Sequence, residues 1–384
     1  MPETVTCFHC QQTGIMEDMY ERYCHPNYRQ PFPEEENWHC EDCLEEIRKC
    51  DFCHSEFHSS QLLGNENLAC PECREELIQC SECEEYVQED ETEIFMDGRV
   101  CQSCAHDIRK NLTYLHPYAY KPEPIFYSLP SELMKPYYGI ELEIDREEED
   151  YNSHIENHAV EIHNQSNGSD LCDYEKYVYI KQDGSLDKGM ELVTHPCTYA
   201  YHMQKMGWKY ILDECDRQGY SSHDIGTCGI HIHISKVAFG STITKQELNI
   251  AKLLLFFETN WSNIKKFSRR NTDSIKKYCD RYGNLSVSEP VEETVKKAKD
   301  AKGRYFAVNL QNENTIEIRI FRGTLKIETF KASLQFTHLL TELMPTISLQ
   351  DTLKLTWNNL IEIASEKGYT EFIEYSKVRK IITD

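Results

Sequence analysis

The sequence lacks any apolar run long enough to cross a membrane, and Lys252 interrupts the longest candidate, residues 250–257. The first seven residues also lack the basic start and the apolar core of a secretory signal. These absences argue against a membrane-spanning or secreted protein. We therefore expect a soluble, intracellular protein of the cytoplasm.

Basic residues are scarce in residues 1–110, which hold 26 Asp+Glu against 8 Lys+Arg in a chain whose net charge is -24. Such an acidic region is a poor binder of phosphate, so a nucleic-acid partner is disfavoured. It would suit a basic protein partner, or simply stay solvated. A basic stretch at residues 265–270 keeps the nucleic-acid alternative open, although we interpret it as the solvated end of a helix.

Cysteine is abundant, with 18 in the chain, and twelve of them form Cys-x-x-Cys pairs in the first 110 residues. In a reducing compartment, paired cysteines indicate metal more often than disulfides. Two such pairs close one tetrahedral zinc site, so the six pairs taken in order predict three structural Zn2+ sites. The pairs are Cys7/Cys10, Cys40/Cys43, Cys50/Cys53, Cys70/Cys73, Cys80/Cys83 and Cys101/Cys104.

The second and third sets form an internal repeat, because Cys50 and Cys80 are 30 residues apart and Cys70 and Cys101 are 31 apart. An apolar residue follows the last cysteine of each set by four, which predicts a short helix beginning at the second pair. The array resembles treble-clef or zinc-ribbon repeats, which are often protein-interaction modules. The first set is longer, and alternative ligands stay open there and nearby: Cys24, His25, His39 and His54.

Five prolines in residues 111–136 predict an extended linker between two domains. We expect zinc repeats over residues 1–110, this linker, and a second domain over residues 137–384. Residues 146–172 are acidic and polar without a clear period, and we interpret them as a loop insertion. Residues 199–219 and 244–267 predict helices.

Four stretches of the second domain alternate aliphatic residues with polar ones, which is typical of a strand with two different faces. They lie near residues 138–145, 190–194, 229–235 and 315–324. One polar strand alone would usually be a solvated face or a cross-strand ion pair. Four such strands indicate a shared site, in which a cation would relieve the repulsion between carboxylates. The polar residues are Glu141, Glu143, Glu191, His231, His233, Glu317 and Arg319.

These motifs resemble the amidoligase family of bacteria, phages and fungi, which belongs with glutamine synthetase and glutamate–cysteine ligase. The resemblance covers residues 137–345 and leaves out the cysteine array. It rests on four motifs in the family's order, at residues 139–143, 183–194, 229–235 and 304–325. It implies an α+β fold in which an antiparallel sheet curls into an open funnel with outer helices.

The resemblance also implies a ligand set. Glu141, Glu143, Glu191, His231 and Glu317 would hold Mg2+ or Mn2+. His233 and Arg319 would contact ATP phosphates, with Asn309 as a further nucleotide contact. Arg319 would also act in catalysis, and Asp183 and Arg322 would contact metal or substrate. The chain departs from glutamine synthetase in having fewer carboxylates around the middle strand and no match to its ammonium site.

The implied function is an ATP- and Mg2+-dependent ligase that joins a carboxylate to an amine through an acyl phosphate. Its substrate would be an amino acid, a peptide or a protein, and the zinc region would deliver a larger, basic target. The alternative is a zinc-repeat adaptor that carries an inactive ligase-like domain. A thiol enzyme using Cys228 near His231 is a further alternative.

Overall fold

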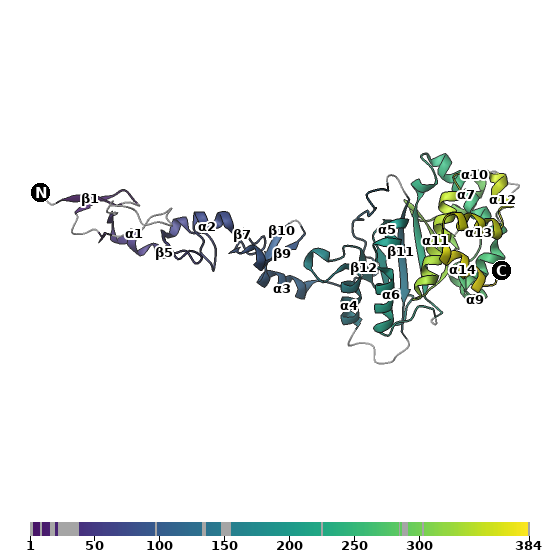
Figure 1. Cartoon of the computed structure of the whole chain (residues 1–384), viewed down its shortest axis with the longest axis horizontal. Helices are drawn as coiled ribbons and strands as arrows, with labels where there is room; N and C mark the ends of the chain where they lie inside the picture. Colours follow the sequence, from purple (N-terminus) through teal and green to yellow (C-terminus); the bar gives the residue numbers. More distant parts are fainter. Residues whose placement is uncertain are drawn as a thin grey trace. The chain divides into compact units, whose positions relative to one another are not determined.

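The computed structural model divides into two compact units, Met1–Leu112 with Asp170–Cys172, and Thr113–Ser169 with Asp173–Asp384. Figure 1 shows the first in purple and blue and the second in teal to yellow. None of the helices described is both long and apolar enough to span a bilayer. The structure describes residues 3–7, 10–15, 20–21, 38–96, 98–132, 136–146, 155–223, 226–283, 285, 291–301 and 303–382.

The first unit consists of small antiparallel hairpins and short helices. In its second and third repeats a helix begins at the second Cys-x-x-Cys pair, as expected: Cys70 caps α2 and Cys101 caps α3, each Sγ accepting the N–H of the cysteine three residues later. The strands are β1 Thr4–Thr6, β2 Thr13–Ile15, β3 Tyr20–Glu21, β4 Trp38–His39, β5 Ile47–Lys49, β6 Glu56–His58, β7 Ile78–Gln79, β8 Tyr86–Val87, β9 Thr92–Phe95 and β10 Gly98–Cys101, and the helices are α1 Glu41–Glu45, α2 Pro71–Glu76 and α3 Gln102–Asn111.

The second unit is built on a sheet whose strands all pair antiparallel, in the order β12-β13-β11-β15-β17-β16, with β14 also paired to β11. The four stretches predicted as strands are strands, and the fold is α+β. The funnel shape stays a prediction. The strands are β11 Tyr137–Ile144, β12 Val178–Lys181, β13 Met190–Thr194, β14 Cys197–Thr198, β15 Gly229–Ser235, β16 Val308–Asn309 and β17 Thr315–Arg322.

The aliphatic face of this sheet forms one hydrophobic core with the helices, because Ile140, Ile232 and Ile318 are buried among helix side chains. That packing leaves the opposite face for polar residues. The helices are α4 Ile155–Asn167, α5 Tyr199–Gln204, α6 Trp208–Arg217, α7 Ile243–Thr259, α8 Trp261–Ser268, α9 Thr272–Tyr278, α10 Val291–Asp300, α11 Ile327–Leu343, α12 Leu349–Lys354, α13 Trp357–Glu366 and α14 Thr370–Val378.

Two predicted helices are each divided in the structure. Residues 199–219 form α5 and α6, which are separated at Gly207, whose φ of 61° is left-handed. Residues 244–267 form α7 and α8, separated at Asn260. The loop expected over residues 146–172 contains α4, whose buried side includes polar groups.

The predicted linker is in part a component of the second unit. Backbone bridges join His116 to Lys181 and Tyr127 to Cys197. Glu175 accepts hydrogen bonds from His116 and from the Tyr120 hydroxyl, the latter at 2.6 Å. His116, Tyr120 and Tyr127 therefore attach parts of the predicted extended linker to the second unit.

Candidate active site and cysteine clusters

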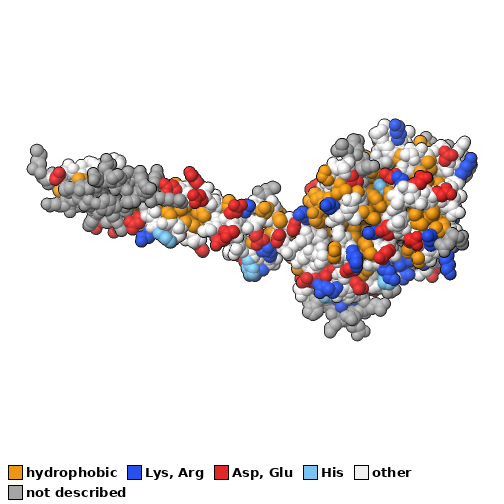
Figure 2. Space-filling model, in the orientation of Figure 1, with side chains coloured by type: hydrophobic (Ala, Val, Ile, Leu, Met, Phe, Trp, Pro, Cys, Tyr) orange, Lys and Arg blue, Asp and Glu red, His pale blue; other side chains and the backbone are white. Residues whose placement is uncertain are grey.

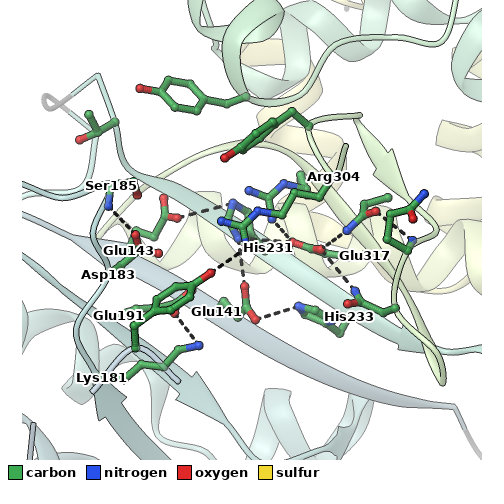
Figure 3. A pocket seen from close by; sticks show the side chains of 18 of the residues that line it. Glu141, Glu143, Lys181, Asp183, Ser185, Glu191, His231, His233, Arg304 and Glu317 are labelled. Atoms are coloured by element: carbon green, nitrogen blue, oxygen red, sulfur yellow. Dashed lines mark hydrogen bonds and ion pairs between the residues drawn. The ribbon is translucent and has the colours of Figure 1, made fainter. Parts of the chain in front are cut away.

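The strand register lines up the polar residues in three rows across the sheet. Directly paired residues share a face, so their side chains are neighbours. One row runs Lys181–Glu191–Glu143, the next joins Glu141 to His231, and the third runs His233–Glu317–Asn309. Figure 3 shows these side chains converging from several strands.

The rows line a cavity of about 540 Å3. All but one of the residues predicted for the ligase site lie on its wall: Glu141, Glu143, Asp183, Glu191, His231, His233, Asn309, Glu317 and Arg319. Arg322 is the exception, because it lines a separate cavity of about 60 Å3 with Arg269 and Arg270. The β15–β17 register shifts between Ile230 and Ile232, but this irregularity does not bring Arg322 into the larger cavity.

The centre of the site is a carboxylate–imidazole cluster. Glu141 lies 3.1 Å from His231 Nδ1 through Oε2 and 3.0 Å from His233 Nε2 through Oε1. Glu317 Oε1 lies 3.5 Å from His231 Nδ1, and Asn309 Nδ2 donates to Glu317 Oε2 at 2.8 Å. Burial would raise the pKa of Glu141 and Glu317, but His233 and His231, with Arg319 beside Glu317, together outweigh it and hold both pKa values below the ordinary range.

Glu191 and Glu143 have pKa values above the ordinary range, unlike Glu141 and Glu317. Burial, followed by the charge of Glu141, raises the pKa of Glu191 well above its usual value. Lys181 opposes that shift through an ion pair of 3.0 Å between Nζ and Glu191 Oε2, labelled in Figure 3. Burial also raises the pKa of Glu143. Burial therefore makes both carboxylates harder to ionise, and a cation bound beside them would oppose that effect.

The donor set fits a divalent cation. Two overlapping groups, Glu141–His233–Glu317 and Glu141–Glu191–His231, each offer ligand atoms that lie within 4.8 Å of one another. Carboxylate oxygens with imidazole suit Mn2+, and the carboxylate oxygens suit Mg2+.

Several lining residues were not predicted from the sequence. Lys181 could have been predicted, because it lies just before the motif that begins near Asp183. In the structure it is the direct strand partner of Glu191. Arg304 Nη1 donates to the Tyr118 hydroxyl at 2.9 Å, which joins the predicted linker to a distant loop over the cavity. Such a contact between remote segments leaves no local signal in the sequence.

The structure corrects our interpretation of Arg270 and argues against the thiol-enzyme alternative. Arg270, which we placed on a solvated helix end, is buried and lines the cavity. Cys228 is also buried, and burial raises the pKa of its thiol, so the thiolate needed by a cysteine nucleophile is disfavoured.

The cysteines gather in three groups of four, in the order in which the pairs occur. In each group the backbone N–H of the third cysteine donates to the Sγ of the first. The distances are 3.5 Å for Cys40 to Cys7, 3.4 Å for Cys70 to Cys50 and 3.3 Å for Cys101 to Cys80. The described cysteines are all free of disulfides.

Sulfur spacing in these groups suits zinc. The second and third cysteines lie with Sγ atoms 3.7 Å apart in the first group and 3.8 Å apart in the other two. A regular tetrahedron with zinc–sulfur distances of about 2.3 Å has edges of about 3.8 Å. His54 is exposed and outside the groups, whereas Cys24, His25 and the His39 side chain lie outside the described residues.

One family model is similar to the region that contains most of this sheet. Residues 161–341, slightly less than half of the chain, match the family model described as "Putative amidoligase enzyme". This region is amidoligase-like. The amidoligase-like region contains Glu191, His231 and Glu317 and begins after β11, which carries Glu141 and Glu143. No curated protein matches the chain.

Two solved structures resemble the chain distantly. A bifunctional glutathione synthetase from Pasteurella multocida shares 13% identity at a TM-score of 0.38, covering 64% of this chain and 46% of that one. The complex between the prokaryotic ubiquitin-like protein Pup and its ligase PafA shares 10% identity at a TM-score of 0.29, covering 64% and 62%. The chain thus spans less than two thirds of either relative.

Proposed function

We propose that the protein is an ATP- and divalent-metal-dependent ligase that joins a carboxylate to an amine. The observation that carries this proposal is the single cavity into which the strand register brings four glutamates, two histidines and Arg319. The amidoligase-like character of residues 161–341 supports it. The substrate would be an amino acid, a peptide or a protein.

Glu141, Glu191 and His231 would hold one divalent cation, with Glu143 beside them on the cavity wall. Glu141, Glu317 and His233 would form a second position, so His233, which we predicted to contact ATP phosphates, is here proposed as a metal ligand. A bound Mg2+ or Mn2+ would neutralise the phosphates of ATP and fix their orientation. The protein's own part is to present ionised carboxylates at Glu141 and Glu317, whose pKa values the neighbouring histidines and Arg319 keep low.

The reaction needs an activated acid, because a carboxylate does not react with an amine at neutral pH. Transfer of the γ-phosphoryl group of ATP to the acid would give an acyl phosphate and ADP. The amine would then attack the acyl carbon and release phosphate. Arg319, whose Nε has no partner among the described residues, would stabilise the charge of the transferred group.

The three cysteine groups would each hold one structural Zn2+ ion. Red acidic side chains are prominent on the visible, described surface of the first unit, and four thiolates around zinc would add to that negative charge (Figure 2). We propose that this unit binds a basic protein target and raises its local concentration for the ligase.

A substrate screen tests the enzymatic proposal. Purified full-length protein is incubated with ATP and Mg2+ against pools of amino acids and peptides, and mass spectrometry detects new amides. We expect an amide that forms with wild-type protein and is lost in Glu317→Gln. If no pool elicits ATP turnover in the wild type, the inactive adaptor replaces the ligase as the better account.

A further inference from the structure

Arg270 is a charged residue of the cavity wall that is buried although its hydrogen-bonding capacity is only partly used. It is only 6% exposed. Its Nη2 donates to the backbone carbonyl of Phe321 at 3.1 Å, and its Nε has no hydrogen-bond partner among the described residues. A buried guanidinium is costly unless an anion and further hydrogen bonds compensate for its lost hydration.

The local backbone directs this side chain into the site. Helix α8 ends at Arg269, whose φ of 60° is left-handed and turns the chain at Arg270. Opposite it stands Gly229, where an added Cβ would lie only 2.3 Å from Arg270 Nη2. The guanidinium therefore occupies the space that a side chain on β15 would fill, close to Glu143 Oε2, which accepts the Gly229 N–H at 2.6 Å.

The neighbouring cations already have partners. Lys181 pairs with Glu191, and Arg319 pairs with Glu317. On the other side of Arg270, the small cavity brings it together with Arg269 and Arg322. Arg269 and Arg322 add positive charge on that side, so neither gives Arg270 a counter-charge there.

We propose that Arg270 is the binding residue for an oxyanion in the cavity, either a phosphate group of the nucleotide or the carboxylate of the acid. A planar guanidinium offers two parallel donors, which match both kinds of oxyanion. The choice of a nucleotide phosphate or a substrate carboxylate as the bound oxyanion rests on the proposed ligase function. The need of Arg270 for an anion follows from its burial.

Isothermal titration calorimetry on the full-length protein tests this inference. The probes are inorganic phosphate, then AMP, ADP and ATP with Mg2+, and separately a panel of small mono- and dicarboxylates. We expect Arg270→Gln to weaken binding of at least one probe class by about tenfold or more, the range of a hydrogen-bonded charge. A loss that grows from AMP to ATP identifies the nucleotide as the source, and a loss confined to carboxylates identifies the acid.

Arg269→Gln is the matched control, because Arg269 Nη2 also donates to a backbone carbonyl after β17, Gly323 O at 3.0 Å, but does not line the larger cavity. Gly229→Ala should reproduce the loss by crowding Arg270 without removing its charge. If Arg270→Gln does not fold, the binding of the same probes is measured with Gly229→Ala and Arg270→Lys, and a loss of binding in these variants supports the proposal.

The inference is overturned if folded Arg270→Gln binds every probe like the wild type, if Arg269→Gln loses as much, or if the wild type binds none of the probes. Failure of the ligase proposal is a separate result. It is seen as absent amide formation by a wild type that still binds phosphate or carboxylate through Arg270.

Discussion

Arg319 and Glu143 have separable roles within the candidate site. The charge that Arg319 would meet grows during phosphoryl transfer, so it contributes more to the transition state than to ATP binding. We expect Arg319→Ala to lower kcat by about a hundredfold while the Kd for ATP changes far less, as is usual for a lost charge-stabilising donor. Steady-state kinetics with a nucleotide titration measures both quantities. Equal losses in kcat and affinity would assign Arg319 to ground-state binding.

Glu143→Ala should act on the metal instead. Removing one carboxylate from the cavity wall weakens the second cation position, so the Mg2+ concentration for half-maximal activity should rise about tenfold. A Mg2+ titration of turnover measures this shift. Unchanged Mg2+ dependence would remove Glu143 from the metal site.

His202 makes the fold sensitive to acid. Its Nε2 donates to the Tyr138 carbonyl at 3.0 Å, and its Nδ1 accepts from Trp208 Nε1 at 3.3 Å, so the neutral ring is fully bonded. Burial lowers its pKa from 6.5 to about 4. The unfolded chain therefore binds this proton first as pH falls, and about 3 kcal/mol of unfolding free energy should be lost between pH 6.5 and 4.

Denaturant unfolding across this pH range tests the role of His202. His202→Gln should be less stable at pH 7 but should show a flatter dependence on pH than the wild type. Identical pH dependence in the two proteins would show that His202 does not titrate on unfolding.

At the scale of elements, the strands can be predicted from the sequence because the alternation of apolar and polar residues lies within each strand. Glu141, His231 and Glu317 each alternate with isoleucine or leucine, and the register then places them side by side. Helix α4 was missed because Ser166 and Asn167 lie on its buried side, where Asn167 bonds the backbone of Tyr177 and Val178, so its apolar period is hidden. Arg270 and Tyr118 reach the cavity through contacts between remote segments, which no local pattern encodes.

The segment after residue 112 depends on one buried acid. Glu175 accepts from both His116 and Tyr120, which anchor the stretch that carries Tyr118. Glu175→Ala would remove the acceptor shared by buried His116 and half-buried Tyr120 and should lower the unfolding free energy by about 2 kcal/mol. Glu123→Ala, on an exposed part of the same segment, is the control. Urea denaturation measures both, and equal stability of the two variants would contradict the anchoring role.

At the scale of the whole molecule, we propose that the two units bind different metals. Three sets of four cysteines predict about three zinc ions per chain by elemental analysis. Cys70→Ser should lower the zinc count by one and open its own repeat to proteolysis. Protein that folds normally without zinc would contradict the proposed zinc sites.

The central claim is that the cavity activates a carboxylate as an acyl phosphate. Once a substrate pair is found, the acid is supplied with oxygen-18 in its carboxylate, and the released phosphate is analysed by mass spectrometry. We expect one ADP and one phosphate per amide, with one oxygen-18 atom in the phosphate. Formation of AMP and pyrophosphate, or of unlabelled phosphate alongside the amide, would contradict it.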